Sequence, residues 1–141
     1  LFVYGRGGSS FVPFVINQAK QAGSANYVES GENKVSAVHV EDAANSYLLA
    51  LETSTGKGLF NISAESVSMK EISESVGRLL NVKTQGISAD KGREQFGKMF
   101  EWLSINNQLD ASKIKERLQW SPNSYRSILE DIENGSYRNF K

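Results

Sequence analysis

Residues 35–51, VSAVHVEDAANSYLLAL, carry the strongest structural pattern in the chain. Val35 to Val40 is a short apolar run typical of a strand. From Val40 to Leu51 the apolar residues recur at i, i+3, i+4, i+7, i+8 and i+11, the spacing of an amphipathic helix. Glu41 and Asp42 fall in its first turn, where the helix dipole favours negative charge. The stretch therefore predicts a strand that runs directly into a helix.

The residues before this unit predict another strand and helix, and then a hairpin. Leu1 to Tyr4 is β-prone and ends in a glycine-rich loop, residues 5–10. Residues 11–22 have helical spacing, with Pro13 in the first turn, where its missing N–H costs nothing. Residues 26–30 and 35–40 are predicted strands, joined through a turn at residues 31–34.

The residues after this unit predict more helices than strands. Strands are expected at 59–63 and, less distinctly, at 83–88. Ser68 and Glu71 fit a capping box that begins a helix continued by Ile72 and Val76. Three further helices are predicted from the apolar spacing in residues 96–103, 110–118 and 125–134. Strands alternating with helices indicate an α/β fold in which helices cover a small sheet.

Composition excludes several classes of function. The length of 141 residues fits one domain spanning residues 1–141. The 16 Lys and Arg balance 16 Asp and Glu, so no positive excess points to nucleic acid. Cys is absent and His39 is the only histidine, so no metal site is expected. No apolar run is long enough to span a membrane. A chain without cysteine suits the cytoplasm.

Two motifs have both a chemical and a structural interpretation. Strand, Gly5-x-Gly7-x-x-Ser10 and helix together resemble a dinucleotide-binding loop, with Glu29 near the place of a ribose-binding acid. However, Ser10 replaces the expected third glycine, and Pro13 removes an N–H. The alternative is a strand-to-helix turn that lines a pocket. Tyr137 and Lys141 spell Tyr-x-x-x-Lys, but at the last residues of the chain, where segments commonly fray.

His39 could serve as a base, but no spacing specifies a partner acid. A hydrogen-bonded structural histidine is the alternative.

The order of these motifs resembles the NAD-dependent epimerase/dehydratase family, within the extended and atypical short-chain dehydrogenase/reductases. The resemblance rests on a series of stretches in sequence order, and it covers nearly the whole chain. These are Val3-Tyr4-Gly5 with its loop, Phe11-Val12-Pro13, residues 31–34, residues 37–44, residues 47–52, Phe60-Asn61-Ile62, residues 68–72 with 76–80, Phe96-Gly97, Ser112-Lys113, Glu116-Arg117-Leu118 and Trp120-Ser121-Pro122.

The resemblance covers only the C-terminal part of that family. It implies a partial Rossmann-like fold: late Rossmann strands in a small sheet, plus a helical substrate lobe. Leu1 to Gly5 would be a late strand with residues 59–63 beside it. The NAD(P) loop and the catalytic Tyr-x-x-x-Lys pair of the family would precede Leu1, so no catalytic, cofactor or metal residue is expected in this chain.

The same resemblance implies that the glycine loop and the strand at 34–39 border a small-molecule substrate pocket. The candidate pocket residues are Tyr4, Arg6, Ser9, Ser10, Lys34, Ser36 and His39. Family members that bind nucleotide sugars often have an arginine just before the histidine strand, whereas this chain has Lys34-Val35-Ser36 there.

Two functions remain open. The first is the substrate-binding lobe of an epimerase/dehydratase-like oxidoreductase, inactive alone. The second is a free-standing, non-catalytic interaction module that has kept the fold. Because the strand at 1–4 would lack a neighbour on one side, the chain is expected to form a homodimer through residues 1–14 or to pair with a missing Rossmann half.

Overall fold

A computed structural model describes residues 1–54, 57–123 and 126–141. At its centre, strand β3 (Lys34–His39) runs directly into helix α2 (Val40–Glu52), as the sequence predicts. Glu41 and Asp42 lie in the first turn of α2. The strand-to-helix unit is thus confirmed, and it gives the chain an α/β fold.

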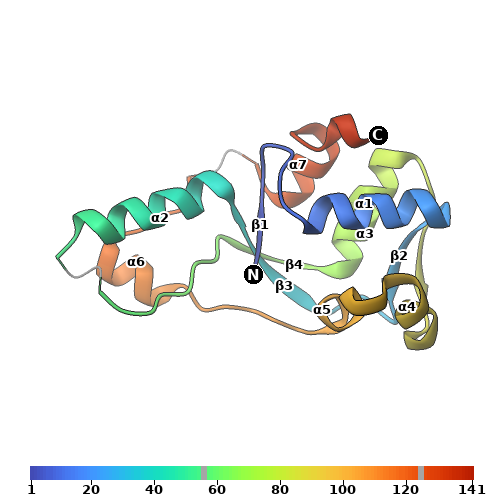
Figure 1. Cartoon of the computed structure of the whole chain (residues 1–141), viewed down its shortest axis with the longest axis horizontal. Coiled ribbons are helices and arrows are strands. Elements are labelled where there is room, and N and C mark those ends of the chain that lie inside the picture. Colours follow the sequence, from blue (N-terminus) through green and yellow to red (C-terminus); the bar gives the residue numbers. More distant parts are fainter. Residues whose placement is uncertain (55–56, 124–125) are drawn as a thin grey trace.

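The other elements follow the order along the chain that is visible in Figure 1. Their bounds are β1 (Phe2–Tyr4), α1 (Phe11–Ala22), β2 (Ala25–Val28), β4 (Glu65–Ser68), α3 (Met69–Leu80), β5 (Thr84–Ile87), α4 (Ala89–Phe96), the 3₁₀ helix η1 (Gly97–Met99), α5 (Phe100–Ser104), α6 (Ser112–Leu118), α7 (Ile128–Asn134) and the 3₁₀ helix η2 (Arg138–Phe140). The predicted start of the last helix at Tyr125 lies outside the described residues.

The strands form two small sheets. In the first, β1 pairs with β3 in parallel and β3 pairs with β4 antiparallel, so the order is β1-β3-β4. In the second, β2 and β5 pair in parallel. The register of the first sheet sets Tyr4 opposite His39. This pairing brings the carboxyl ends of β1 and β3 together.

The predicted hairpin is wrong, because β2 and β3 lie in different sheets. Positive φ angles at Glu29 and Gly31 turn the chain after β2. The segment that follows then bonds to the start of α3, where Met69 N donates to the carbonyl of Asn33 and Lys70 N to that of Gly31. The turn therefore separates the two strands.

Two further predictions need correction. Residues 59–63 form no strand and are not the neighbour of β1; the strand in this region is β4, which begins at Glu65. The helix predicted from Phe96 to Leu103 is broken into α4, η1 and α5, because Gly97 adopts a φ of 53° that ends α4. The capping box of α3 is confirmed, with Ser68 and Glu71 bonded in both directions.

Two apolar clusters hold the fold together. The larger lies among α1, β2, α3 and α7 and includes Phe11, Ile16, Ile72 and Ile132. The smaller lies among β3, α2 and α6, at the other end of the molecule in Figure 1. It contains six buried residues: Val38, Ala43, Ala111, Ile114, Leu118 and Trp120.

Helix α2 buries a different face from the one that its apolar spacing indicates. Asp42, Ala43 and Ser46 are buried, whereas Leu48 and Leu51 are 51% and 84% exposed. The reason is a pair of polar anchors at the start of the helix. Trp120 Nε1 donates a hydrogen bond to the backbone carbonyl of Asp42 at 2.9 Å. Asn123 N donates one to the side-chain Oδ1 of Asp42 at 2.7 Å.

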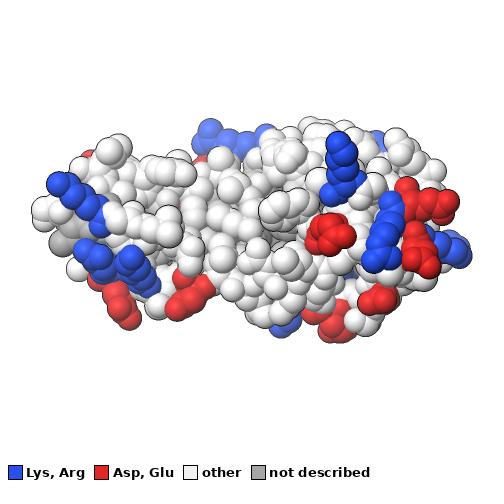
Figure 2. All heavy atoms as spheres, turned by 60° about the horizontal axis from the view of Figure 1, so that its bottom comes forward, with Lys and Arg blue, Asp and Glu red and all other residues white. Residues whose placement is uncertain are grey.

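Charged side chains of both signs are dispersed over the surface. Figure 2 shows Lys and Arg beside Asp and Glu on one face, with a broad uncharged area between the two ends. No large single-sign patch is visible on this face, which agrees with the zero net charge.

Candidate functional site

The carboxyl ends of β1 and β3 meet beside an open depression of about 410 Å³. Ligands of open α/β sheets bind outside the carboxyl ends of parallel strands, so this is the place to look for a site. Two of the residues that line the depression, Arg6 and His39, are among the pocket residues predicted from the sequence. The others are Glu41, Arg126, Asp131 and Ser136.

Gly5 packs closely against His39, one of the residues that line the depression. Gly5 has a φ of 111°, and a Cβ atom there would overlap the imidazole ring of His39. His39 Nδ1 accepts a hydrogen bond from the backbone N–H of Glu41 at 3.3 Å, so the ring caps α2. Tyr4 packs edge-on against the same ring, with centroids 5.4 Å apart. The structural interpretation of His39 is therefore the better supported one.

Arg6 and Glu41, which both line the depression, form an ion pair. Arg6 Nη2 lies 2.6 Å and Nε 3.0 Å from Glu41 Oε1. Both side chains are largely exposed, so the pair contributes little to stability. The pair does place a cation and an anion on the wall of the depression, where a polar ligand could displace one partner.

Tyr137 holds the glycine loop from the other end of the chain. Its hydroxyl accepts a hydrogen bond from Gly5 N at 2.9 Å and donates one to the carbonyl of Gly8 at 2.7 Å. The side chain is fully buried, and burial raises the pKa of the hydroxyl above its ordinary value. Tyr137 therefore stays protonated and bridges the loop as a structural residue.

Asp131 organises the segment that presents Tyr137. Its Oδ1 accepts from Ser136 N at 2.8 Å, and its Oδ2 accepts from Ser136 Oγ at 2.7 Å. Asp131 is 3% exposed, and a Cβ at Gly135 would overlap its carboxylate. These contacts fix the turn after α7 against the glycine loop.

Tyr4 is buried beneath the depression and does not open into it. Its hydroxyl lies 2.7 Å from Glu65 Oε1 and 2.9 Å from the carbonyl of Arg126. The same Glu65 oxygen accepts from Ile128 N at 2.8 Å. Tyr4 and Glu65 thus anchor the start of α7 and set the position of Arg126.

The other residues predicted for the pocket, Ser9, Ser10, Lys34 and Ser36, are not among those that line the depression. Ser9 Oγ accepts from Phe11 N at 3.2 Å, and Ser10 precedes α1 without a capping hydrogen bond from its side chain. Ser36 is buried, and its Oγ accepts from Leu109 N at 2.8 Å. Lys34 begins β3, about 16 Å of strand from His39. The structure does not bring Lys34 and Ser36 to the depression.

Sequence reasoning missed the residues that complete the depression from the C-terminal side. Arg126, Asp131 and Ser136 come from a segment more than eighty residues beyond His39. Their only local signal is the helix end predicted at Asn134-Gly135. Tyr137 stands out in the sequence as half of a Tyr-x-x-x-Lys motif, and its role as a bridge has no sequence signature.

The glycine loop does not fit the pyrophosphate of a dinucleotide. Such a loop binds phosphate through free backbone N–H groups at the start of a helix. Here Gly5 N is bonded to Tyr137, Phe11 N to Ser9, and Pro13 has no N–H. The alternative of a pocket-lining turn is therefore favoured over a cofactor loop.

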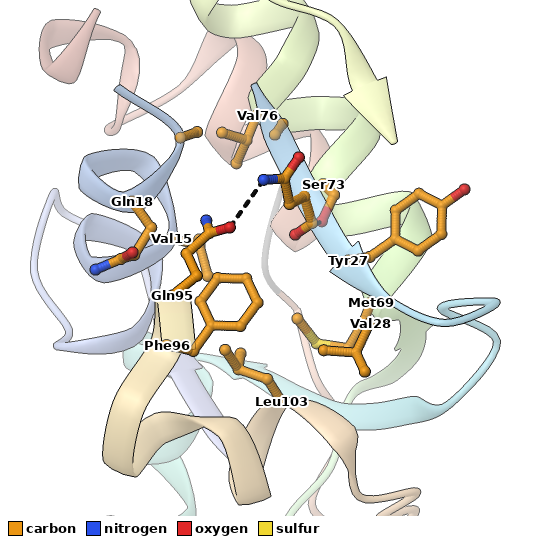
Figure 3. Close-up of a pocket in the computed structure, with 13 residues that line it drawn as sticks. Val15, Gln18, Tyr27, Val28, Met69, Ser73, Val76, Gln95, Phe96 and Leu103 are labelled. Atoms are coloured by element: carbon orange, nitrogen blue, oxygen red, sulfur yellow. Dashed lines mark hydrogen bonds between the residues drawn. The ribbon is translucent and has the colours of Figure 1, made fainter. Parts of the chain in front are cut away.

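A second cavity lies inside the larger core, between α1, β2 and α4 (Figure 3). Its volume is about 20 Å³, which suits a single water molecule and excludes a substrate. Asn26 Nδ2 donates to Gln95 Oε1 at 2.8 Å at its edge. Gln95 lines this cavity, and its Nε2 is buried with no hydrogen-bond partner among the described residues.

Neither a metal site nor a membrane segment emerges from the described residues. Within residues 1–54, 57–123 and 126–141, no three acidic or histidine side chains gather in a way that could hold a metal ion. In the same ranges, no helix is both long and apolar enough to cross a membrane.

Comparison with known proteins matches residues 2–63 to the NAD dependent epimerase/dehydratase family. An uncharacterized protein of Schizosaccharomyces pombe is 33% identical over 136 residues, covering 96% of this chain and 46% of the relative. An uncharacterized protein of Saccharomyces cerevisiae is 32% identical, covering 92% and 44%. The chain thus spans less than half the length of these curated relatives.

Solved structures share the fold across the whole chain. An epimerase from Methanothermobacter thermautotrophicus matches with a TM-score of 0.71 at 15% identity, covering 99% of this chain and 42% of its own. ADP-L-glycero-D-manno-heptose-6-epimerase of Helicobacter pylori matches at 0.67 and 18%, covering 99% and 41%. UDP-glucuronic acid 4-epimerase of Bacillus cereus, solved with UDP-glucuronic acid and NAD, matches at 0.65 and 17%, covering 99% and 42%.

These matches confirm the resemblance stated from the sequence. The chain is similar to the NAD-dependent epimerase/dehydratase family and has the Rossmann-like α/β fold of these enzymes.

Proposed function

We propose that this chain is the substrate-binding lobe of an NAD(P)-dependent epimerase/dehydratase-like oxidoreductase of the cytoplasm. In this proposal, residues 1–141 act as one domain that binds a polar small molecule. The NAD(P) cofactor is held by a Rossmann half that this sequence does not contain. The lobe alone is catalytically silent.

The observation that carries the proposal is the open depression at the carboxyl ends of β1 and β3. It is lined by two arginines, two acids, a histidine and a serine, contributed by parts of the chain far apart in sequence. Such a cluster of polar groups at a parallel sheet end suits a polar ligand with hydroxyl or anionic groups.

Each group has a role that its position supports. Arg126 is exposed at the rim and offers a guanidinium to an anionic group of the ligand. Arg6 and Glu41 line the depression as an ion pair that a ligand can exchange for its own contacts. His39 lines the depression, and Gly5 packs against its ring. None of these side chains is assigned the chemical step.

NADH binding tests the assignment of the cofactor to another half. We expect no saturable change in NADH fluorescence at micromolar concentrations of the 141-residue chain, because the N–H groups of Gly5, Gly8 and Phe11 are already hydrogen-bonded and Pro13 has none. Micromolar affinity for NADH would contradict the assignment of the cofactor to another half and would favour the glycine loop as a phosphate-binding site.

Ligand mapping tests the depression itself. With millimolar UDP-glucuronic acid as the probe, we expect chemical-shift changes at the amides of Arg6, His39 and Ser136, and none at Trp102. The variant Arg126→Ala should weaken the response. Shifts absent from the depression would contradict the proposed site.

The second candidate is a non-catalytic interaction module. The observation that favours it is the exposed apolar face of α2, where Tyr47, Leu48 and Leu51 are 70%, 51% and 84% exposed. An unperturbed depression in the ligand titration, together with specific protein binding through α2, would select this candidate.

A further inference from the structure

A further open depression, of about 300 Å³, lies where the end of α3 meets the C-terminal segment. Helices α3 and α7 pack against each other (Figure 1). The lining residues come from the last turns of these two helices, from η2 and from the residue after it. They are Arg78, Leu79, Glu133, Asn134, Arg138 and Lys141, and we call this hollow the α3–α7 depression. None of them lines the depression at the carboxyl ends of β1 and β3.

Positive side chains dominate the α3–α7 depression. Arg78, Arg138 and Lys141 are set there against a single acidic side chain, that of Glu133. Arg138 and Lys141 are exposed, and neither side chain has an ion-pair partner among the described residues. Because the net charge of the chain is zero, this excess is local. Cations around one hollow repel one another, and a bound anion relieves that repulsion.

The guanidinium of Arg78 is held in a fixed orientation on the wall of the α3–α7 depression. Its Nη2 lies 2.7 Å from Glu133 Oε1 and 3.2 Å from Ser75 Oγ. Ser75 is fully buried and donates to the same Glu133 oxygen at 2.7 Å. The side chain of Arg78 is nevertheless 57% exposed. A guanidinium has five N–H donors, so Arg78 has donors left for a ligand.

Stabilisation of a helix end explains only part of this arrangement. Arg78 lies in the last turn of α3, where a cation interacts favourably with the helix dipole. That effect falls off within the last turn of a helix. Lys141 follows η2 and lies well beyond the end of α7 at Asn134, so the dipole of α7 does not account for its position. The gathering of the three cations therefore needs another explanation.

We propose that the α3–α7 depression binds a phosphate group, either as the free ion or on a small phosphate monoester. Arg78, already oriented by Glu133, offers its remaining N–H groups to the phosphate oxygens, which match the fork of a guanidinium. Arg138 and Lys141 supply the charge that a phosphate dianion requires. The inference goes beyond the proposed function, because it concerns residues that do not line the depression assigned to the substrate.

A small anion suits this depression better than a polymer does. The hollow measures about 300 Å³, and its cations come from three residues. A nucleic acid needs a row of phosphate contacts, and the chain has no positive excess to provide one. A single phosphate group needs only the local cluster, so the size and the charge of the depression both favour it.

A bound phosphate would also stabilise the segment that holds the glycine loop. Arg138 directly follows Tyr137, whose hydroxyl is bonded to Gly5 N and to the carbonyl of Gly8. A ligand shared by Arg78 of α3 and Arg138 of η2 ties these two elements together. Since a ligand that binds only the folded state stabilises it, the bridge from Tyr137 to the loop should open less often when phosphate is bound.

Titration with inorganic phosphate at constant ionic strength, followed by amide chemical shifts, tests the site. We expect saturable shifts at Arg138 and Lys141, and none when chloride replaces phosphate. The double variant Arg138→Gln/Lys141→Gln should raise the dissociation constant about fivefold or more, because two charges are lost. The matched control Lys91→Gln/Lys98→Gln removes the same charge from exposed residues outside the depression, and it should leave the dissociation constant within about twofold.

Three further measurements complete the test. Glycerol 3-phosphate as a second probe identifies the source of the phosphate group: binding of both probes supports a monoester, and binding of inorganic phosphate alone supports the free ion. A Gly-Ser-Gly extension after Lys141 moves the terminal carboxylate away from that side chain, and phosphate affinity should stay equal or rise. Circular dichroism of both double variants should match the wild type, because the four substituted residues are exposed.

The outcomes that overturn the site are distinct. They are the absence of a saturable response to phosphate, loss of binding in the extended chain, and equal weakening in the two double variants. Hydrogen exchange at the Gly5 amide tests the link to the glycine loop. It should slow at saturating phosphate in the wild type and stay unchanged in Arg138→Gln/Lys141→Gln. Unchanged exchange in the wild type at saturating phosphate would overturn that link.

Discussion

Tyr137 joins two parts of the chain through a single hydroxyl. That oxygen is bonded to Gly5 N and to the carbonyl of Gly8, both in the loop that borders the depression. Tyr137→Phe leaves these two backbone groups without a partner while keeping the ring. We expect a loss of about 2 kcal/mol in the free energy of unfolding, measured by urea denaturation.

Tyr47→Phe is the matched control for that measurement. Tyr47 is 70% exposed on α2, so removing its hydroxyl should leave stability within about 0.5 kcal/mol of the wild type. Equal stability of Tyr137→Phe and wild type would contradict the bridging role.

Single residues also show why the site could be predicted only in part. Tyr4 and His39 were predicted as neighbours of a pocket, and the parallel register of their strands brings them together. The contacts that hold the glycine loop against the C-terminal segment span 129 to 132 positions, from Gly8 and Gly5 to Tyr137. No local pattern in a sequence encodes pairings at that separation, so Asp131 and Ser136 had no functional signal, and the motif that singled out Tyr137 did not indicate its bridging role.

The start of α3 makes a pH-dependent contribution to stability. Hydrogen bonds from the backbone N–H and the hydroxyl of Ser68 lower the pKa of Glu71. A lowered folded-state pKa means that this contribution is present above the ordinary Glu pKa of about 4.3 and is lost as the pH falls through the folded value. Ser68→Ala should therefore cost about 1 kcal/mol at pH 7 and less at pH 3.

Ser127→Ala provides the comparison for that pH dependence. Ser127 Oγ accepts from Glu130 N at the start of α7, while the Glu130 carboxylate accepts from Asn134 instead of returning to the cap. Thermal melts of the Ser127 variant should show a loss that changes little between pH 3 and pH 7. The same pH dependence in both variants would refute the assignment to Glu71.

Helices were predicted better than strands because a helix is determined by its own residues. The capping box at Ser68 and Glu71, and the stop at Gly23, each act within one turn. A strand instead needs a partner. Residues 59–63 have an apolar pattern but form no strand, while the less apolar β4 pairs antiparallel with β3. The apolar spacing of α2 predicted the helix. The face that the helix buries is set by the hydrogen bonds that Trp120 and Asn123 donate to Asp42.

At the scale of the whole molecule, the two apolar clusters differ in size and in how far the helices around them are shielded from solvent. Among the described residues, the larger cluster has twenty buried members and the smaller has six, and Leu48 and Leu51 of α2 beside the smaller cluster are exposed. Burial of apolar area is the main stabilising term, so the smaller cluster should open at a lower free energy than the larger one. Hydrogen exchange is expected to show α2 and α6 exchanging through local opening, while α1 and α3 exchange only through global unfolding.

Trp120→Phe distinguishes local opening from a uniformly stable molecule. Trp120 is 1% exposed in the smaller cluster, and its Nε1 is bonded to the carbonyl of Asp42. The substitution removes both volume and a donor, so exchange in α2 and α6 should accelerate while exchange in α1 stays unchanged, because the larger cluster does not include Trp120. Equal acceleration in all four helices would mean that both clusters unfold as one unit.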